Sequence, residues 1–239
     1  MSEPAEREVT SPREIAVVLE REIAALPTQA KLASEHALMQ RFGTTRATVR
    51  RALADLEARH LVRRVRGAGN FVNRRIDFVL APGSTPSLHE VVRAAGATAR
   101  TYVIASATAP APADIAAHLG VEPGVPCQRL HRVGCIDDVE ASVAEEWIAP
   151  SVLDHVDIGL RAIESLADAL RAARHDPVRA WSRAVTDLAP AEVAERLGVP
   201  AGAAMWCLET LTREGATGGA LMFSRSWLRQ DRVRLVVEL

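Results

Sequence analysis

Cysteine, aromatic residues and long apolar runs are scarce in this chain of 239 residues. Three cysteines are too few for a disulfide framework in a protein of this size, which favours a reducing compartment. No apolar run reaches the roughly 18 residues that a membrane helix needs, and the acidic, polar residues 1–10 do not resemble a signal peptide. We therefore expect a cytoplasmic protein without a membrane segment, long enough for two domains.

The net charge of −1 conceals an uneven distribution of charge. Residues 41–75 carry ten arginines and two acidic side chains, a net charge of +8, whereas residues 1–40 carry four basic and seven acidic side chains, a net charge of −3. Lys31 is the only lysine, so codon preference explains the choice of arginine over lysine but not its concentration in one segment. Such a basic segment is typical of proteins that bind a polyanion.

The first 75 residues have the pattern of three helices and a hairpin. Ser11, Pro12 and Glu14 form a helix start with a capping box. Helices are predicted over 11–26, 34–42 and 45–59, and strands over 61–65 and 70–72. Gly43 permits a tight turn between the second and third helices. This order predicts a winged helix-turn-helix that binds double-stranded DNA.

The third helix and the hairpin tip supply the candidate DNA contacts. An arginine in the first turns of a recognition helix can bond guanine in the major groove, and glycines at a wing tip allow close approach to the backbone. A merely solvated helix face is the alternative interpretation of these side chains. The predicted DNA-binding residues are Thr45, Arg46, Thr48, Arg50, Arg51, Arg66, Gly67 and Gly69.

Three segments resemble the DNA-binding domain of the GntR family: LASE at 32–35, FGTTRATVRRAL at 42–53 and RGAGNFV at 66–72. In that family the positions of Thr45, Arg46, Thr48, Arg50 and Gly67 approach DNA. The chain departs from the family pattern in two places. The segment before 32 lacks the usual glycine-proline turn, and a histidine at position 36 stands where an arginine often touches phosphate.

The second part of the chain contains a duplication. The sequence APADIAAHLGV at 111–121 is repeated as APAEVAERLGV at 189–199. Each copy predicts a short helix that ends at a glycine and leads into a hairpin, with strands over 125–133 and 143–148 in the first copy and over 203–211 and 221–228 in the second. A helix over 163–173 separates the copies. Two such units predict one sheet built from duplicated halves.

A helix–hairpin duplication behind this winged helix resembles the UTRA domain of the HutC subfamily, whose fold is similar to chorismate lyase. The resemblance implies an α+β protein with a winged helix-turn-helix over 1–75 and, over 76–239, an antiparallel sheet with flanking helices that binds an effector and dimerises. Residues 228–235 look like the final strand of that family.

A candidate effector site lies around a predicted helix start and an inward arginine. Ser87 and Glu90 form another capping box, although an ordinary capped helix is the alternative interpretation. Arg132 aligns with a ligand-binding arginine of the family and lies on a largely apolar strand face, where it needs an anionic partner. The predicted effector-binding residues are Ser84, Thr85, Ser87, His89, Arg132 and Glu146.

The same comparison shows departures from the family pocket. Gly134 stands where a second arginine is common, Glu146 replaces a serine, Met222 a glutamate and Val233 a tyrosine. We expect the effector to be a small anionic metabolite, phosphorylated or carboxylated, whose identity the sequence does not decide.

Cys127, His131 and Cys135 have a spacing of four that would place them on one face of a helix. Their segment reads as a strand, which spreads them too far apart for one zinc ion. We expect no metal and no cofactor, and we expect the four tryptophans to lie in the core.

The leading interpretation is a repressor, not an enzyme, that binds an inverted-repeat operator as a homodimer. One alternative is a lyase-like enzyme, although no constellation of acid, base or electrophile stands out. The other is a constitutive DNA-binding protein with a vestigial pocket.

Overall fold

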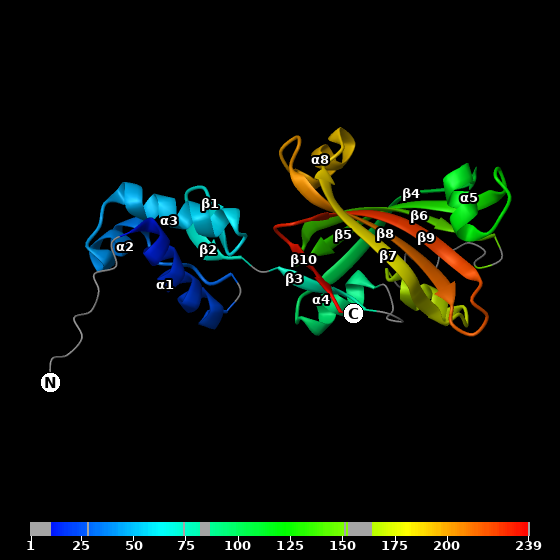
Figure 1. Ribbon diagram of the computed structural model, residues 1–239, viewed down its shortest axis with the longest axis horizontal. Helices are drawn as coiled ribbons and strands as arrows, with labels where there is room; N and C mark the ends of the chain where they lie inside the picture. The colour runs from blue at the N-terminus through cyan, green and yellow to red at the C-terminus, as the bar shows by residue number, and fades with distance from the viewer. Residues whose placement is uncertain are drawn as a thin grey trace. The chain divides into compact units, whose positions relative to one another are not determined.

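The computed structural model describes residues 11–27, 29–73, 75–81, 87–150, 152 and 164–238 (Figure 1). The chain divides into two units, with the boundary between Arg75 and Ile76. Within the described ranges, no helix combines the length and apolar character needed to cross a membrane.

The first unit begins with three helices, α1 (Pro12–Ala25), α2 (Glu35–Phe42) and α3 (Arg46–Ala58). Each helix starts at a hydroxyl side chain that accepts a hydrogen bond from the backbone N–H three residues on: Ser11, Ser34 and Thr45. The capping box predicted at Ser11 is present. The helices bury one apolar core, which includes Ile15, Leu19, Leu38, Val49 and Leu56.

A two-stranded hairpin of β1 (Val62–Val65) and β2 (Gly69–Val72) follows the helices. Gly67 and Gly69 have φ angles of 77° and 112°, which side chains other than glycine rarely adopt. Val62 and Val72 join the helical core. The winged helix-turn-helix predicted from the sequence is therefore confirmed.

The second unit is built on a six-stranded antiparallel sheet with the strand order β4-β5-β6-β9-β8-β7. Its strands are β4 (Ala99–Pro110), β5 (Pro126–Ile136), β6 (Val139–Ile148), β7 (Pro177–Leu188), β8 (Ala204–Glu214) and β9 (Ala220–Arg229). Its helices are α4 (Leu88–Ala94), α5 (Ala113–Leu119), α7 (Leu166–Ala172) and α8 (Ala191–Leu197). A parallel pair, β3 (Ile76–Leu80) and β10 (Val233–Val237), completes the unit.

The duplication is visible as two strand–helix–hairpin halves, β4-α5-β5-β6 and β7-α8-β8-β9, which meet where β6 pairs with β9. Both repeated helices end at a glycine in the left-handed conformation, Gly120 and Gly198. The sequence predicted the helix and hairpin of each half but missed the strand that opens it.

The two faces of the sheet are covered differently. On one face, α5 packs over Trp147 and Phe223, and α8 packs near Val143 and Trp227. On the other, α7 packs over Leu130, and α4 and the β3/β10 pair cover a separate cluster. Figure 1 draws α5 and α8 above the sheet and α4 below it. Each tryptophan of the chain belongs to one of these clusters, as the sequence predicted.

Three sequence-based boundaries need correction. The last strand begins at Val233, not at Leu228, which belongs to β9. β5 continues past Gly134 to Ile136, because a register shift after Gly134 lets pairing resume. The helix predicted over 163–173 is observed as α7 with Ser165 as its cap, and position 163 lies outside the described residues.

Candidate functional site

The predicted DNA-binding side chains gather at the start of α3 and at the hairpin. The hydroxyl oxygen of Thr45 lies 3.3 Å from the backbone nitrogen of Thr48 and 2.9 Å from its hydroxyl oxygen. These contacts fix the first turn of α3. Arg50 and Arg51 are exposed further along the helix.

Arg46 is held at the same end of α3 by an acidic residue of α2. Its Nε lies 2.9 Å from a carboxylate oxygen of Glu35, and Arg64 of β1 lies 3.5 Å from the other oxygen. The Arg46 side chain nevertheless remains 71% exposed, so it is oriented by Glu35 without being buried. A hollow beside this ion pair is lined by α3, by the hairpin, including the exposed Arg66 and Gly67, and by Lys31. The lining of this hollow carries four basic side chains, Lys31, Arg46, Arg64 and Arg66, and two acidic ones, Glu35 and Glu57, so its net charge is positive.

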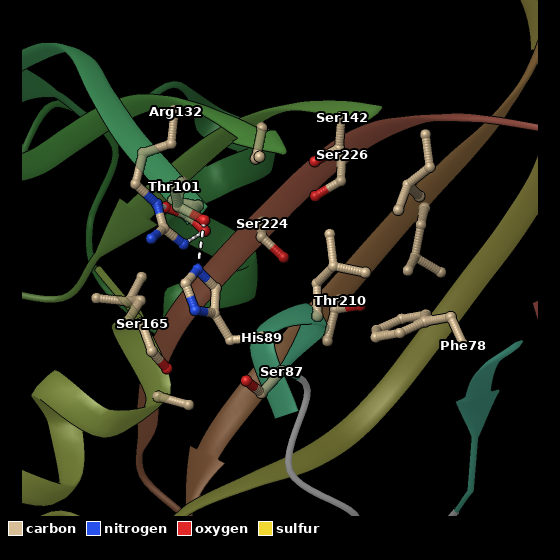
Figure 2. A pocket seen from close by; sticks show the side chains of 18 of the residues that line it. Phe78, Ser87, His89, Thr101, Arg132, Ser142, Ser165, Thr210, Ser224 and Ser226 are labelled. Carbon is tan, nitrogen blue, oxygen red and sulfur yellow. Dashed lines mark hydrogen bonds and ion pairs between the residues drawn. The ribbon is translucent and has the colours of Figure 1, made fainter. Parts of the chain in front are cut away.

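The second unit contains a cavity of about 100 Å³ between the sheet and the elements β3, α4 and α7. Arg132, Thr101 and His89 are drawn together at one end of it in Figure 2, and Ser142 and Ser226 lie farther along its floor. Leu88 and Leu166 contribute apolar walls. Charged, hydroxyl and apolar side chains therefore all face the same small space.

Arg132 and Glu146 form a buried, bidentate ion pair in this cavity. The Nε and one terminal nitrogen of Arg132 donate to the two carboxylate oxygens of Glu146 over 2.5 and 2.6 Å. The other terminal nitrogen donates to the backbone carbonyl of Glu164 over 3.0 Å. The two side chains are only 11% and 6% exposed. The anionic partner that the sequence required for Arg132 is thus supplied by the protein itself.

His89 lies beside this pair on α4. Its Nε2 is 2.6 Å from the hydroxyl oxygen of Thr101, whose backbone N–H donates to the carboxylate of Glu164 over 3.1 Å. Burial lowers the pKa of His89 below its usual 6.5, and the positive charge of Arg132 lowers that pKa further. The imidazole is therefore neutral near pH 7 and adds no positive charge to the cavity.

The floor of the cavity carries hydroxyl groups from neighbouring strands. Thr210 of β8 pairs in register with Ser224 of β9, and the residue opposite Ser224 on β6 is Glu146. Ser142 lies opposite Gly134, where an added Cβ atom would stand 2.5 Å from the Ser142 hydroxyl oxygen. A side chain at position 134 would therefore require the Ser142 hydroxyl to move.

Of the predicted effector-binding residues, Ser87, His89, Arg132 and Glu146 line the cavity, whereas Ser84 and Thr85 lie outside the described residues. Ser87 caps α4 as expected, but the carboxylate of Glu90 pairs with Arg171 of α7.

Sequence reasoning missed the hydroxyl residues of the cavity: Thr101, Ser142, Ser165, Thr210, Ser224 and Ser226. The alternation of side chains along β9 places Ser224 and Ser226 on the same face of the strand, which the sequence could have shown. Their proximity to Arg132 depends on how β5, β6 and β9 pair, which the sequence did not show.

Comparison with known families covers both units. The family of bacterial regulatory proteins called gntR matches residues 13–72, and the UTRA domain matches residues 94–234. An HTH-type transcriptional regulator of Rhizobium meliloti is 31% identical over 210 residues, which are 85% of this chain and 84% of the relative. This chain belongs to the GntR family of transcriptional regulators.

The regulator is also similar to GgaR, an HTH-type transcriptional regulator of Escherichia coli, at 31% identity over 162 residues, 67% of this chain and 63% of GgaR. Among solved structures, PhnF from Mycobacterium smegmatis has a TM-score of 0.65 and 25% identity, and the alignment covers 94% of this chain and 98% of PhnF. These proteins are regulators and not enzymes, so the lyase alternative is set aside. The resemblances to the GntR and UTRA families are confirmed.

Proposed function

We propose that this regulator binds double-stranded DNA through α3 and the hairpin, and that a small molecule in the cavity of the second unit controls its affinity for DNA. The observation that carries the first part is the exposed Arg46 at a capped helix start, oriented by Glu35 beside a glycine-tipped wing. The second part is supported by the cavity, in which a buried ion pair lies beside hydroxyl groups. A ligand site uses a few such polar groups on an otherwise apolar lining to orient its ligand.

We further propose that the regulator acts in the cytoplasm as a homodimer on an inverted repeat, as a repressor. One winged helix makes few base contacts, and two-fold symmetry doubles them. The edge strands support this proposal, because Tyr102 and Ile104 on β4 and Val185 and Leu188 on β7 are exposed apolar side chains that a second copy could cover.

The proposed DNA contacts can be tested on a binding site obtained by selection. Such a site is first selected from random duplex DNA, and fluorescence anisotropy then compares wild type with Arg46→Ala at fixed salt. Loss of a bidentate base contact costs about 1–3 kcal/mol. Arg196→Ala makes the same change of charge in the second unit, where Arg196 is exposed on α8 and pairs with Glu140, and should leave the affinity unchanged. Equal affinity of wild type and Arg46→Ala would contradict the proposed placement of α3.

The oligomeric state has its own test. Sedimentation of the full chain, alone and with a palindromic duplex, should give a dimer and a complex of one dimer per duplex. A monomer at micromolar concentration that also binds the duplex as a monomer would refute the dimer.

A further inference from the structure

The charge of the cavity restricts what it can bind. Among the described residues that line it, Arg132 is the only permanent cation and Glu146 the only carboxylate, and they neutralise one another. His89, the remaining titratable group of the lining, favours its neutral form. The described part of the lining therefore offers an entering anion no uncompensated positive side chain.

An anion cannot readily take Arg132 from its partner. Separating the pair would leave a carboxylate that is almost completely buried without its counter-charge, which is strongly unfavourable. The remaining terminal nitrogen of Arg132 also donates one hydrogen bond to the backbone carbonyl of Glu164. A phosphate or carboxylate would lie close to the negative charge of Glu146, and it would find three of the five N–H donors of Arg132 already in use.

The cavity does offer hydrogen bonds to an uncharged ligand. Each oxygen of Glu146 accepts one bond from Arg132 and retains acceptor capacity for a ligand hydroxyl. The hydroxyl groups of Ser142, Ser224 and Ser226 have no hydrogen-bond partner among the described residues, so they are available as donors and acceptors. Figure 2 shows Ser224 between the Arg132 end and the end where Ser142 and Ser226 lie.

The size of the cavity sets the size of the ligand. A buried water needs about 10–15 Å³ of such space, so a cavity of about 100 Å³ holds a molecule of about seven to ten non-hydrogen atoms. A molecule of four or five carbons, each of which carries a hydroxyl group, has that size. The apolar contacts from Leu88 and Leu166 suit the C–H faces of such a molecule.

We propose that the effector cavity of this regulator takes an uncharged polyhydroxylated molecule, a small polyol or unphosphorylated sugar, and that Glu146 excludes anions by neutralising Arg132. This inference rests on the proposed function, in which the cavity is the effector site. It departs from the anionic effector expected from the sequence, because the partner of Arg132 is a side chain of the same cavity.

The exclusion of anions is tested with inorganic phosphate and the full-length protein. Calorimetry should detect no saturable binding of phosphate to wild type at millimolar concentration, whereas Glu146→Gln, which frees Arg132, should bind phosphate at least about tenfold more tightly. Glu145→Gln is the matched control, because Glu145 is the next residue of β6, pairs with Arg129 and points to the opposite face of the sheet. If Glu146→Gln is poorly folded by circular dichroism, Glu146→Ser replaces it.

Phosphate binding to wild type as tight as to the Glu146 variant would overturn the proposal. So would a folded Glu146 variant with no gain in phosphate affinity, because Arg132 would then not be the group that Glu146 neutralises.

The ligand class is tested with compounds that are matched in carbon number and differ in charge. Erythritol and ribose are compared with erythronate and ribonate, which have the same number of carbons and a similar size, by the rise in melting temperature of the full chain and then by their effect on DNA affinity. The uncharged members should stabilise wild type, and Ser224→Ala should abolish or reduce their effect.

Stabilisation by the charged members alone, or by no member of the panel, would refute the uncharged ligand. A failure of the proposed function looks different: uncharged ligands would bind in the cavity, but saturation with them would leave DNA affinity unchanged.

Discussion

Arg132→Met should strongly destabilise the second unit, independently of any ligand. The substitution removes the positive partner of Glu146, whose side chain is 6% exposed. Removing one member of a buried ion pair costs about 3–5 kcal/mol, because the other charge is left unpaired in a medium of low polarity. For a unit of this size that cost corresponds to a fall in melting temperature of roughly 6–20 °C.

The size of the loss should depend on which partner is removed. Glu146→Gln leaves a neutral acceptor beside Arg132, which keeps its bond to the carbonyl of Glu164, so the expected cost is smaller, about 1–3 kcal/mol. The double variant Arg132→Met with Glu146→Met buries no unpaired charge and should be more stable than Arg132→Met alone.

Tryptophan fluorescence isolates this effect in the full-length protein. Trp147, Trp181, Trp206 and Trp227 are the only tryptophans of the chain and all belong to the second unit. Urea unfolding followed by fluorescence therefore reports that unit without interference from the DNA-binding unit. A loss below about 1 kcal/mol in Arg132→Met, or a double variant no more stable than it, would show that the pair is not a buried structural contact.

Three further outcomes are expected. Gly134→Ala should destabilise the second unit by about 1–3 kcal/mol, as measured by urea unfolding, because the added Cβ clashes with the Ser142 hydroxyl. Adding Ser142→Ala should recover most of that loss, because the nearest atom of residue 142 would then be its Cβ at 3.9 Å. The stability of the second unit should fall as the pH drops below about 6.5, because His89 has a lowered pKa in the folded protein and binds a proton more readily in the unfolded chain. A dependence of unfolding free energy on pH that is the same in His89→Gln would contradict this. Thr45→Ala should lose about 0.5–2 kcal/mol of first-unit stability and weaken DNA binding, with recovery in Thr45→Ser, as followed by far-ultraviolet circular dichroism and anisotropy.

The winged helix could be predicted almost completely from the sequence because its signals are local. Ser11, Ser34 and Thr45 each mark a helix start through a bond to a residue three positions away. Gly67 and Gly69 mark the hairpin tip through their own backbone angles. None of these features depends on contacts with distant parts of the chain.

The strands β4 and β7 could not be predicted in the same way. They are the edges of the sheet, and much of each strand is exposed on both faces, so the alternation of apolar and polar residues that marks a half-buried strand is weak. Their pairing with β5 and β8 depends instead on the antiparallel register that the rest of each half imposes.

The ion pair of the cavity shows a different limit. The alternation along β5 predicted that Arg132 points inward and needs an anion. It did not identify Glu146 as that anion, because the two residues are 14 positions apart and meet diagonally across a hairpin whose register includes a shift after Gly134. The cost of burying an unpaired charge thus predicted that Arg132 needs an anionic partner, and the pairing of β5 with β6 determines that this partner is Glu146.

The duplication explains why the charge lies at one end of the cavity only. Leu130 pairs with Glu146 in the first half, as Leu208 pairs with Ser226 in the second. Arg132, opposite Ala144, likewise corresponds to Thr210, opposite Ser224. Two equivalent positions of the repeated hairpin therefore hold the ion pair of Arg132 and Glu146 in the first half and the hydroxyl groups of Thr210 and Ser226 in the second. Because β6 and β9 are neighbours, the halves place these two sets side by side on one floor, and a ligand that spans both must hydrogen-bond to a neutralised ion pair and to hydroxyls at once.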